Sequence, residues 1–305
     1  MKIRFFNHWH TGDVFHAKGY IQDLRRQLPD TEFWYVHPNH AKLMKDVAEY
    51  ENVASMQPAI DQRERGRFVD TTVDINTWIG AYGWDVMPQG EEHGNWPSIH
   101  RMFTSIYYIL ADNGIPVSID AANPLAYVPT TDFSVYDIAN GNKFLDETEG
   151  MPRMLLCNGV VRSQQSKLGD LKESVITLAT EFPDRAFICT SKFETELSNI
   201  YFTDDIFGLT NDVNEIAYLS THCDVIVGKN SGPYMYTHIQ DNFFSPETTF
   251  VSLSHRPSDA YPCHLSWEGC RYWHHSSDDS GRITEVLREA IKSPGHGPGH
   301  MEVFD

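Results

Sequence analysis

The stretch Asp224–His238, DVIVGKNSGPYMYTH, decides the fold of this chain. Its first five residues form a short run rich in β-branched side chains, which predicts a buried strand of a parallel sheet. A polar turn, Lys229–Gly232, follows, and Pro233 suits the first position of a helix. Such a strand, turn and helix direct backbone N–H groups at a ligand above the strand, and Lys229 adds a positive charge. The stretch therefore predicts either an anion-binding turn or an ordinary tight bend that its glycine permits.

Strand and helix patterns alternate through the rest of the chain. We expect strands at residues 3–6, 33–36, 71–80, 154–157, 186–189, 224–228 and 249–253, and helices at 15–28, 40–50, 97–113, 168–182, 213–220 and 281–291. Such alternation is typical of doubly wound α/β domains, and 305 residues suffice for two of them. We predict an α/β fold of two Rossmann-like domains, 1–150 and 151–305, that face a central cleft. The junction is expected at the end of the weakly periodic segment 123–150, and the Gly- and Pro-rich tail 293–300 is expected to be loose.

The composition is that of a soluble globular protein, with 41% hydrophobic and 22% charged residues. A net charge of −18 would repel nucleic acid, so we expect no nucleic-acid partner, and an anionic small ligand would need a local basic pocket. The sequence has neither an apolar run long enough to span a membrane nor a signal-peptide pattern. We therefore expect a cytoplasmic protein without a transmembrane segment, and peripheral attachment to a membrane stays open. Cys157, Cys189 and Cys223 belong to strand-like surroundings and are expected to be buried.

The loop HWHTGDVFHAKG, residues 8–19, joins the first strand to the first helix, so it lies at the edge of the sheet where open α/β folds bind ligands. Gly12 lets the chain turn, and Asp13 comes at the start of the helix, where the helix dipole stabilises a carboxylate. Asp13 is then either a helix-capping residue or a general base that deprotonates an acceptor hydroxyl. His10 and His16 could assist that base, and Gly12 and Lys18 are assigned to the acceptor side.

Two stretches suggest a family. Gly12-Asp13, a helix ending in LRRQLPD and the strand EFWYV resemble the N-terminal signature of heptosyltransferase-like glycosyltransferases, and CDVIVGKNSGPYMYTH is similar to the donor-site stretch of that family. The resemblance implies the two-domain GT-B fold, with a nucleotide-sugar donor held by the C-terminal domain and the acceptor by the N-terminal one. It also implies that Asp13 is the base and that Ser231 and Gly232 contact the diphosphate. Asn230 stands where the family usually has Asp, and Tyr234–Tyr236 replace its downstream His, so the sugar is left open.

Polar residues also follow two other strands of the second half. Asn158, Gly159, Arg162 and Gln165 come after the strand 154–157, and Thr190, Ser191 and Lys192 come after the strand 186–189. Residues at strand ends border ligand crevices, although many of them merely keep a loop soluble. Lys192 and Lys229 are the expected diphosphate partners. The predicted donor-binding set is Asn158, Arg162, Thr190, Ser191, Lys192, Lys229, Asn230, Ser231, Gly232 and Tyr234.

Metal sites are the weaker interpretation of the remaining His and Cys residues. His8, His10 and His16 share one loop at a spacing that can bind zinc, but no further type of ligand clusters there. Cys263, His264, Cys270, His274 and His275 form a second group, whose spacing misses the usual form of a structural zinc site. Motifs for P-loop hydrolysis, esterase chemistry and dinucleotide binding are also missing from the sequence. We therefore predict an inverting glycosyltransferase that needs no metal or cofactor, with a nucleotide-sugar donor and a glycan or glycolipid acceptor. A sugar-nucleotide epimerase and a non-catalytic nucleotide-binding module are the alternatives.

Overall fold

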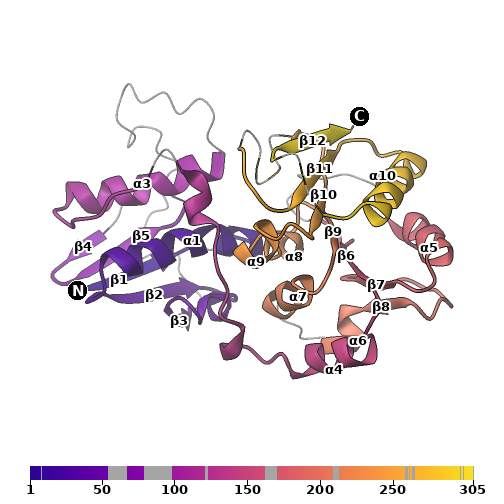
Figure 1. Cartoon of the computed structure of the whole chain (residues 1–305). Coiled ribbons are helices and arrows are strands. Elements are labelled where there is room, and N and C mark those ends of the chain that lie inside the picture. Colours follow the sequence, from indigo (N-terminus) through magenta and orange to yellow (C-terminus); the bar gives the residue numbers. More distant parts are fainter. Residues whose placement is uncertain are drawn as a thin grey trace. The chain divides into compact units, whose positions relative to one another are not determined.

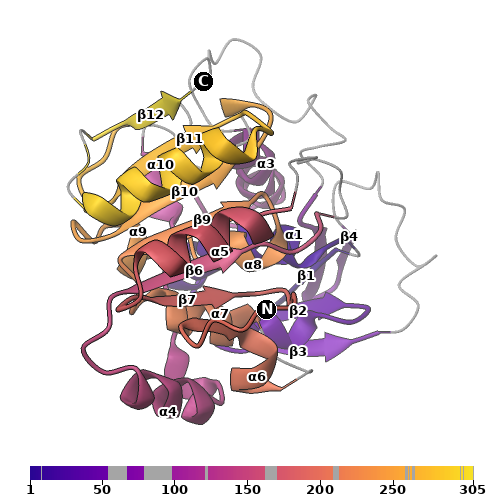
Figure 2. The ribbon, with the colours of Figure 1, turned by 90° about the vertical axis from the view of Figure 1, so that its right-hand side faces the viewer.

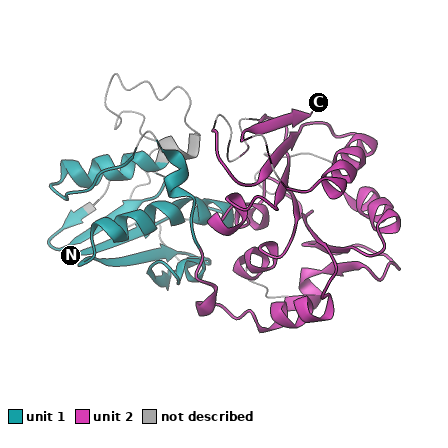
Figure 3. Ribbon diagram, viewed as in Figure 1, with its two compact units in different colours: residues 1–130 teal, residues 131–305 magenta. Residues whose placement is uncertain are grey.

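The computed structural model of the chain divides into two compact units, Met1–Thr130 and Thr131–Asp305 (Figure 3). The structure describes residues 1–7, 9–53, 67–78, 98–120, 123–161, 170–208, 213–257, 260, 262, 265–295, 297 and 299–304. The division falls after Thr130 rather than near Gly150, because the intervening segment packs on the second unit. It contains the helix α4 (Ala139–Glu147), whose Phe144 ring meets the Tyr201 ring edge-on at 5.0 Å.

Unit 1 contains a five-stranded sheet in the order β3-β2-β1-β5-β4 (Figure 1). The strands are β1 (Lys2–Phe6), β2 (Glu32–His37), β3 (Glu49–Asn52), β4 (Arg67–Val69) and β5 (Thr72–Asn76). All neighbours are parallel except β4, which runs antiparallel to β5. The helical segments are α1 (Thr11–Gln27), η1 (Ala41–Met44), α3 (Ser98–Asp112) and η3 (Pro124–Tyr127).

Helix α1 forms because its apolar side chains recur on one face, and that face is buried in unit 1. Tyr20 stacks on Phe103 at 4.7 Å and on Tyr127 at 4.9 Å, which joins α1 to α3 and η3. Gly19 permits this approach, because a Cβ atom at that position would lie 1.8 Å from the Tyr127 carbonyl oxygen.

The helix expected at residues 40–50 is wrong. This segment contains only the single 3-10 turn η1 and then enters β3, which pairs in parallel with β2. Leu43, Met44 and Val47, which suggested a helix, are indeed buried. Local polar contacts favour the irregular turn instead, because the Asn52 side chain accepts the Ala41 N–H at 3.0 Å.

Unit 2 contains a seven-stranded parallel sheet in the order β12-β11-β10-β9-β6-β7-β8. The strands are β6 (Arg153–Cys157), β7 (Ala186–Cys189), β8 (Ile200–Phe202), β9 (Val225–Lys229), β10 (Thr249–Leu253), β11 (Arg271–His275) and β12 (Met301–Phe304). Besides α4, the helical segments are η4 (Phe133–Val135), α5 (Lys172–Glu181), α6 (Thr203–Phe207), α7 (Val213–Ser220), α8 (Gly232–Met235), α9 (Gln240–Phe243) and α10 (Ser280–Lys292).

The core of unit 2 lies on both faces of this sheet. Figure 2 shows α5 and α10 side by side over one face, where they cover apolar residues of β6, β7, β9 and β10. On β9, Val225 and Val227 belong to that cluster, whereas Gly228 faces the other side and contacts Tyr234 of α8. Cys157, Cys189 and Cys223 are buried as expected, and burial raises the pKa of all three thiols.

The C-terminal tail differs from the expectation of a loose segment. Its described residues pack on unit 2: the Gly295 N–H donates to Thr249 Oγ1 at 2.8 Å, and the Gly299 carbonyl accepts the Trp267 N–H at 2.9 Å. The chain then forms β12, which pairs with β11. The glycines make this packing possible, because a Cβ atom on Gly297 would lie 2.7 Å from the Arg271 Cα atom.

Candidate functional site

The strand order reverses once in each unit. In unit 2 the reversal lies between β6 and β9: β7 and β8 follow on the side of β6, and β10, β11 and β12 follow on the side of β9. In unit 1 it lies between β1 and β5. Open α/β sheets bind ligands beyond the carboxyl ends of their strands at such a reversal point. Lys229–Gly232 and Asn158 follow the strands at the point in unit 2, and the loop that carries Asp13 follows β1 in unit 1.

The end of β9 offers two groups suited to an anion. Lys229 is the last residue of the strand and is only 6% exposed; burial lowers the pKa of its ammonium group, while the nearby Asp170 carboxylate opposes that shift. Ser231 is the N-cap residue of α8, yet its side chain does not cap the helix. Its buried hydroxyl has no hydrogen-bond partner among the described residues. A buried ammonium group and an unsatisfied hydroxyl both gain free energy from a polar ligand.

The helix dipole contributes less than the sequence suggested, because α8 is a single turn of four residues. Stabilisation of an anion here would depend on Lys229, on the Ser231 hydroxyl and on backbone N–H groups. Asn230 and Gly232 lie in the same partly exposed turn. Arg162 and Gln165, two further candidates, fall outside the described residues.

Asn158 connects the ends of β6 and β7. Its Oδ1 atom accepts the Ser191 N–H at 2.8 Å and its Nδ2 atom donates to the Ser191 carbonyl at 2.9 Å, while the Thr190 hydroxyl lies 3.5 Å from Oδ1. Both ends of the amide are therefore used to hold the two loops in register. Lys192 is exposed and forms an ion pair with Asp205 of α6, so its charge already has a partner.

Tyr234 is placed differently from the expectation. Its ring is 1% exposed and lies against Gly228, where a Cβ atom would come within 2.2 Å of the ring. The Nδ1 atom of His238 donates to the Tyr234 carbonyl at 3.0 Å, its Nε2 atom lies 3.0 Å from the Tyr272 hydroxyl oxygen, and its ring stacks on Phe250 at 4.8 Å. Through these residues α8 is anchored to β10 and β11.

Asp13 occupies the third position of α1 and caps the helix from there, with Oδ2 accepting the His10 N–H at 2.8 Å. Burial raises the pKa of the Asp13 carboxyl, and the His10 N–H opposes the rise. Among the described residues, none donates to the other oxygen, Oδ1. A carboxylate with a raised pKa and an available oxygen is suited to proton abstraction. Gly12 and His10 flank it, and His16 lies one turn further along the helix.

Lys18 is also placed differently from the expectation. Its side chain is 0% exposed and its Nζ atom lies 2.6 Å from the Asp46 carboxylate, which is equally buried. A buried ion pair of this kind fixes α1 to the segment before β3. Lys18 is therefore a residue that holds the unit 1 fold, and it offers no surface to an acceptor.

The sequence analysis missed an aromatic pair at the reversal point of unit 1. Both strands at the reversal point of unit 1 end in Asn-x-Trp, Asn7–Trp9 after β1 and Asn76–Trp78 after β5. Each Asn side chain accepts the N–H of its own Trp, at 3.2 and 2.9 Å, and the two indole rings lie 6.0 Å apart. Trp9 is 37% exposed. Because the two motifs follow adjacent strands, their repetition in the sequence was the available signal.

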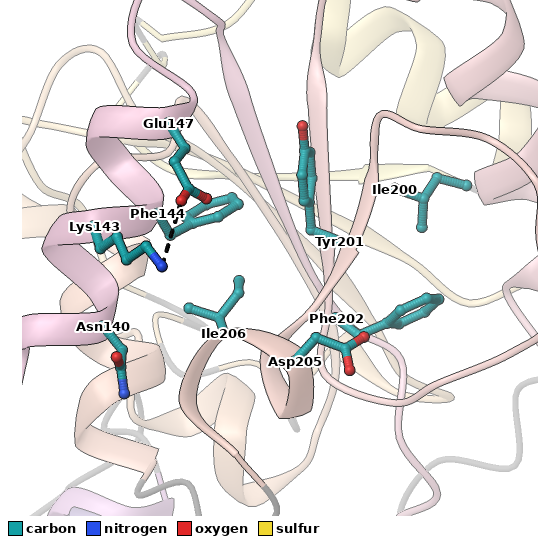
Figure 4. Close-up of a pocket in the computed structure, with 9 residues that line it drawn as sticks. All are labelled: Asn140, Lys143, Phe144, Glu147, Ile200, Tyr201, Phe202, Asp205 and Ile206. Atoms are coloured by element: carbon teal, nitrogen blue, oxygen red, sulfur yellow. Dashed lines mark ion pairs between the residues drawn. The ribbon is translucent and has the colours of Figure 1, made fainter.

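A pocket of about 360 Å³ lies elsewhere in unit 2, between α4, β8 and α6 (Figure 4). Its lining residues are Asn140, Lys143, Phe144, Glu147, Ile200, Tyr201, Phe202, Asp205 and Ile206. Lys143 pairs with Glu147 at 3.7 Å across its rim. Since β8 is the edge strand of the sheet, this pocket is separate from the reversal point between β6 and β9.

Within the ranges that the structure describes, no three His, Cys, Asp or Glu side chains gather as metal ligands, and no helix could cross a membrane. Of the second His and Cys group, Cys263 and His264 are outside those ranges, as is His8 of the first. His274 is buried and its Nε2 atom lies 3.0 Å from the Ser254 hydroxyl.

No protein-family model matches the sequence, and no curated protein matches it either. Solved structures do match. The E. coli heptosyltransferase WaaC with ADP is 10% identical with a TM-score of 0.55, over 96% of this chain and 99% of that one. A family 9 glycosyl transferase from Veillonella parvula is 12% identical with a TM-score of 0.53, over 96% and 92%, and E. coli ADP-heptose heptosyltransferase II is 13% identical with a TM-score of 0.50, over 96% and 99%. The chain therefore has the fold of these heptosyltransferases, the GT-B fold predicted from its sequence.

Proposed function

We propose that the protein transfers a sugar from a nucleoside-diphosphate sugar to an acceptor hydroxyl. The observation that carries the proposal is the end of β9, where a buried Lys229 ammonium group and an unsatisfied Ser231 hydroxyl lie at the reversal point of a Rossmann-like sheet. Lysine is well suited to binding phosphate because its ammonium group is a compact point charge, and the buried setting strengthens its interaction with an anion. ADP in the E. coli heptosyltransferase WaaC supports the choice of a nucleoside diphosphate.

Each unit supplies one part of the reaction. Unit 2 holds the donor diphosphate through Lys229, Ser231 and the turn N–H groups, with Asn158 fixing the neighbouring loop. Unit 1 supplies Asp13, whose carboxylate takes the proton of the acceptor hydroxyl. The acceptor oxygen then bonds to the sugar carbon as the bond from that carbon to the diphosphate oxygen breaks. A single displacement of this kind inverts the configuration at the sugar carbon.

Lys229 makes a metal ion unnecessary for this step. The departing diphosphate gains negative charge, and an ammonium group already in place stabilises that charge without reorganisation. The paired Trp9 and Trp78 rings at the reversal point of unit 1 offer the acceptor an apolar surface, which suits a sugar ring. The acceptor is therefore a glycan or the glycan part of a glycolipid.

The first test is binding followed by turnover. Full-length protein is titrated calorimetrically with ADP, UDP, GDP and their sugar derivatives, and the best ligand is then incubated with mono- and oligosaccharide acceptors. We expect one nucleoside diphosphate to bind tightly, and its sugar to appear on an acceptor with inverted configuration by NMR. An epimerase would convert the donor without any acceptor, and a non-catalytic module would bind the nucleotide and leave the donor intact. Either result would contradict the proposal.

A further inference from the structure

One peptide group in unit 1 is held from both ends. This is the peptide group between Trp9 and His10, whose N–H, on His10, donates to Asp13 Oδ2 at 2.8 Å. Its carbonyl oxygen, on Trp9, lies 3.1 Å from Nε2 of His37. His37 is the last residue of β2, the strand next to β1. An imidazole and a carboxylate that do not touch are thus joined through a single peptide group.

The hydrogen bonds of His37 define its tautomer. Its Nδ1 atom receives the N–H groups of Asn39 at 3.1 Å and of His40 at 3.0 Å, so Nδ1 carries a lone pair. The Trp9 carbonyl can only accept, so Nε2 carries the proton and donates it. Both ring nitrogens are engaged and the side chain is 1% exposed. The imidazole is consequently a fixed, neutral donor that points at the Trp9 carbonyl.

Donation into a peptide carbonyl has an effect at the other end of the same group. It polarises the peptide, and the N–H becomes a stronger donor in a chain of hydrogen bonds. That N–H binds one carboxylate oxygen of Asp13 and leaves the other for an incoming hydroxyl. Among the described residues, the titratable groups that face the Asp13 carboxyl are His10 of its own element and Tyr35 of β2, whose hydroxyl also receives an N–H from Asn7 at 2.8 Å.

We propose that His37 is a positioning residue for Asp13, acting through the Trp9–His10 peptide group. The inference rests on the proposed function, in which Asp13 is the base. His37 fixes the orientation of the loop after β1 and strengthens the one N–H that orients the carboxylate. It does not itself touch the substrates.

Two substitutions separate this role from a structural one. In His37→Asn the shorter amide oxygen can take the place of Nδ1 and keep the N–H groups of Asn39 and His40, but nothing reaches the Trp9 carbonyl. In His37→Gln the amide NH₂ can take the place of Nε2 and donate to that carbonyl. We expect His37→Asn to lower kcat about tenfold, with the acceptor KM, nucleotide Kd and Tm close to wild type. His37→Gln should recover most of that loss even if its Tm is lower.

A purely structural role predicts the reverse order, with activity following Tm and the glutamine variant no better than the asparagine one. That result would overturn the inference. A double-mutant cycle adds a second criterion: in an Asp13→Asn background, His37→Asn should have almost no further effect on kcat, because the residue that it positions is gone. Additive losses would contradict action through Asp13.

A readout independent of turnover tells failure of this inference from failure of the proposed function. In ¹³C NMR of the full-length protein, the Asp13 carboxyl should titrate about half a unit higher in His37→Asn than in wild type, because the orienting N–H is a weaker donor. The His10 amide should also exchange its hydrogen faster. If both are unchanged, the inference is wrong whatever the enzyme does. Wild-type turnover of Asp13→Asn would instead refute the proposed function.

Discussion

Replacing Lys229 by methionine should weaken nucleotide binding far more than it changes stability. Methionine keeps the length of the side chain and removes its charge. In the folded protein Lys229 is almost completely buried, and burial lowers the pKa of its ammonium group. A buried charge costs desolvation free energy, which an apolar side chain of similar size avoids. The substitution also removes the attraction of the nearby Asp170 carboxylate, so we expect the Tm of Lys229→Met in the absence of ligand to stay close to that of the wild type.

Nucleotide binding should respond much more strongly. A hydrogen bond between a charged donor and a phosphate contributes about 1.5–3 kcal/mol, so its loss should raise the Kd for the nucleoside diphosphate by roughly 10- to 150-fold. Calorimetric titration of both proteins with the same nucleotide measures this ratio, and thermal denaturation without ligand gives the change in stability. A nucleoside monophosphate lacking the second phosphate should show a smaller difference between the two proteins.

Lys192→Met is the matched control, because Lys192 lies in the loop that follows β7 of the same sheet but is exposed and paired with Asp205. An exposed ion pair contributes little, so both its Tm and its nucleotide affinity should stay close to wild type. The reasoning would be refuted if Lys229→Met lowered the Tm and left the Kd unchanged. Lys229 would then be a structural residue, and the diphosphate would bind elsewhere.

Three further outcomes are expected. In Asp13→Asn the side chain can still accept the His10 N–H but cannot take a proton. Turnover in a product assay should therefore fall about 10²–10⁴-fold, while Tm and nucleotide affinity stay close to wild type. Turnover near the wild-type rate would exclude Asp13 as the base. Burial lowers the pKa of His238 to about 4 from 6.5, so the unfolded state takes up the proton first and stability is lost as pH falls from 6.5 toward 4. Urea denaturation should show up to about 3 kcal/mol of that loss, and His238→Gln should flatten the profile. Gly228→Ala places a Cβ atom against the Tyr234 ring, so it should lower the free energy of unfolding by about 1–3 kcal/mol and weaken nucleotide binding. If stability and binding are both unchanged, the ring is free to move.

The strands of the central sheets were predictable because they are buried on both faces. Ala186–Cys189 is a continuous apolar run, and the β-rich stretch Thr249–Leu253 is buried at every position. Short runs of this kind between polar residues favour buried strands of a parallel sheet. The strand Arg271–His275 was missed because two of its five residues are histidines, whose burial depends on partners from other strands, such as Ser254. The helix Ala139–Glu147 was missed because Gly141 and Asn142 disfavour it locally. Contacts with α6 and α7 compensate, and they are invisible in the local sequence.

For the candidate site, the positions of residues along the chain could be predicted from the sequence, but the directions of some side chains could not. Asp13, Lys229 and Ser231 could be located from sequence because each directly follows a strand end or starts a helix, and the strand order then brings them to the reversal points. Tyr234 and Lys18 belong to the same two segments, but their side chains are buried in the fold. The direction of a side chain in a turn or at the boundary of a helix depends on what packs against it, here Gly228 and Asp46. Local sequence does not contain that information.

The buried cysteines have a practical consequence for measuring motion. Cys157, Cys189, Cys223 and Cys270 are all inaccessible, and burial raises the pKa of each thiol, so very little reactive thiolate forms at neutral pH. With Cys263 changed to serine, a maleimide dye should react preferentially with cysteines introduced at exposed positions such as Lys143 of unit 2 and Tyr50 of unit 1. Energy transfer between two such dyes would follow the distance between the units in solution, with and without a nucleotide, in a protein that keeps its four native interior thiols.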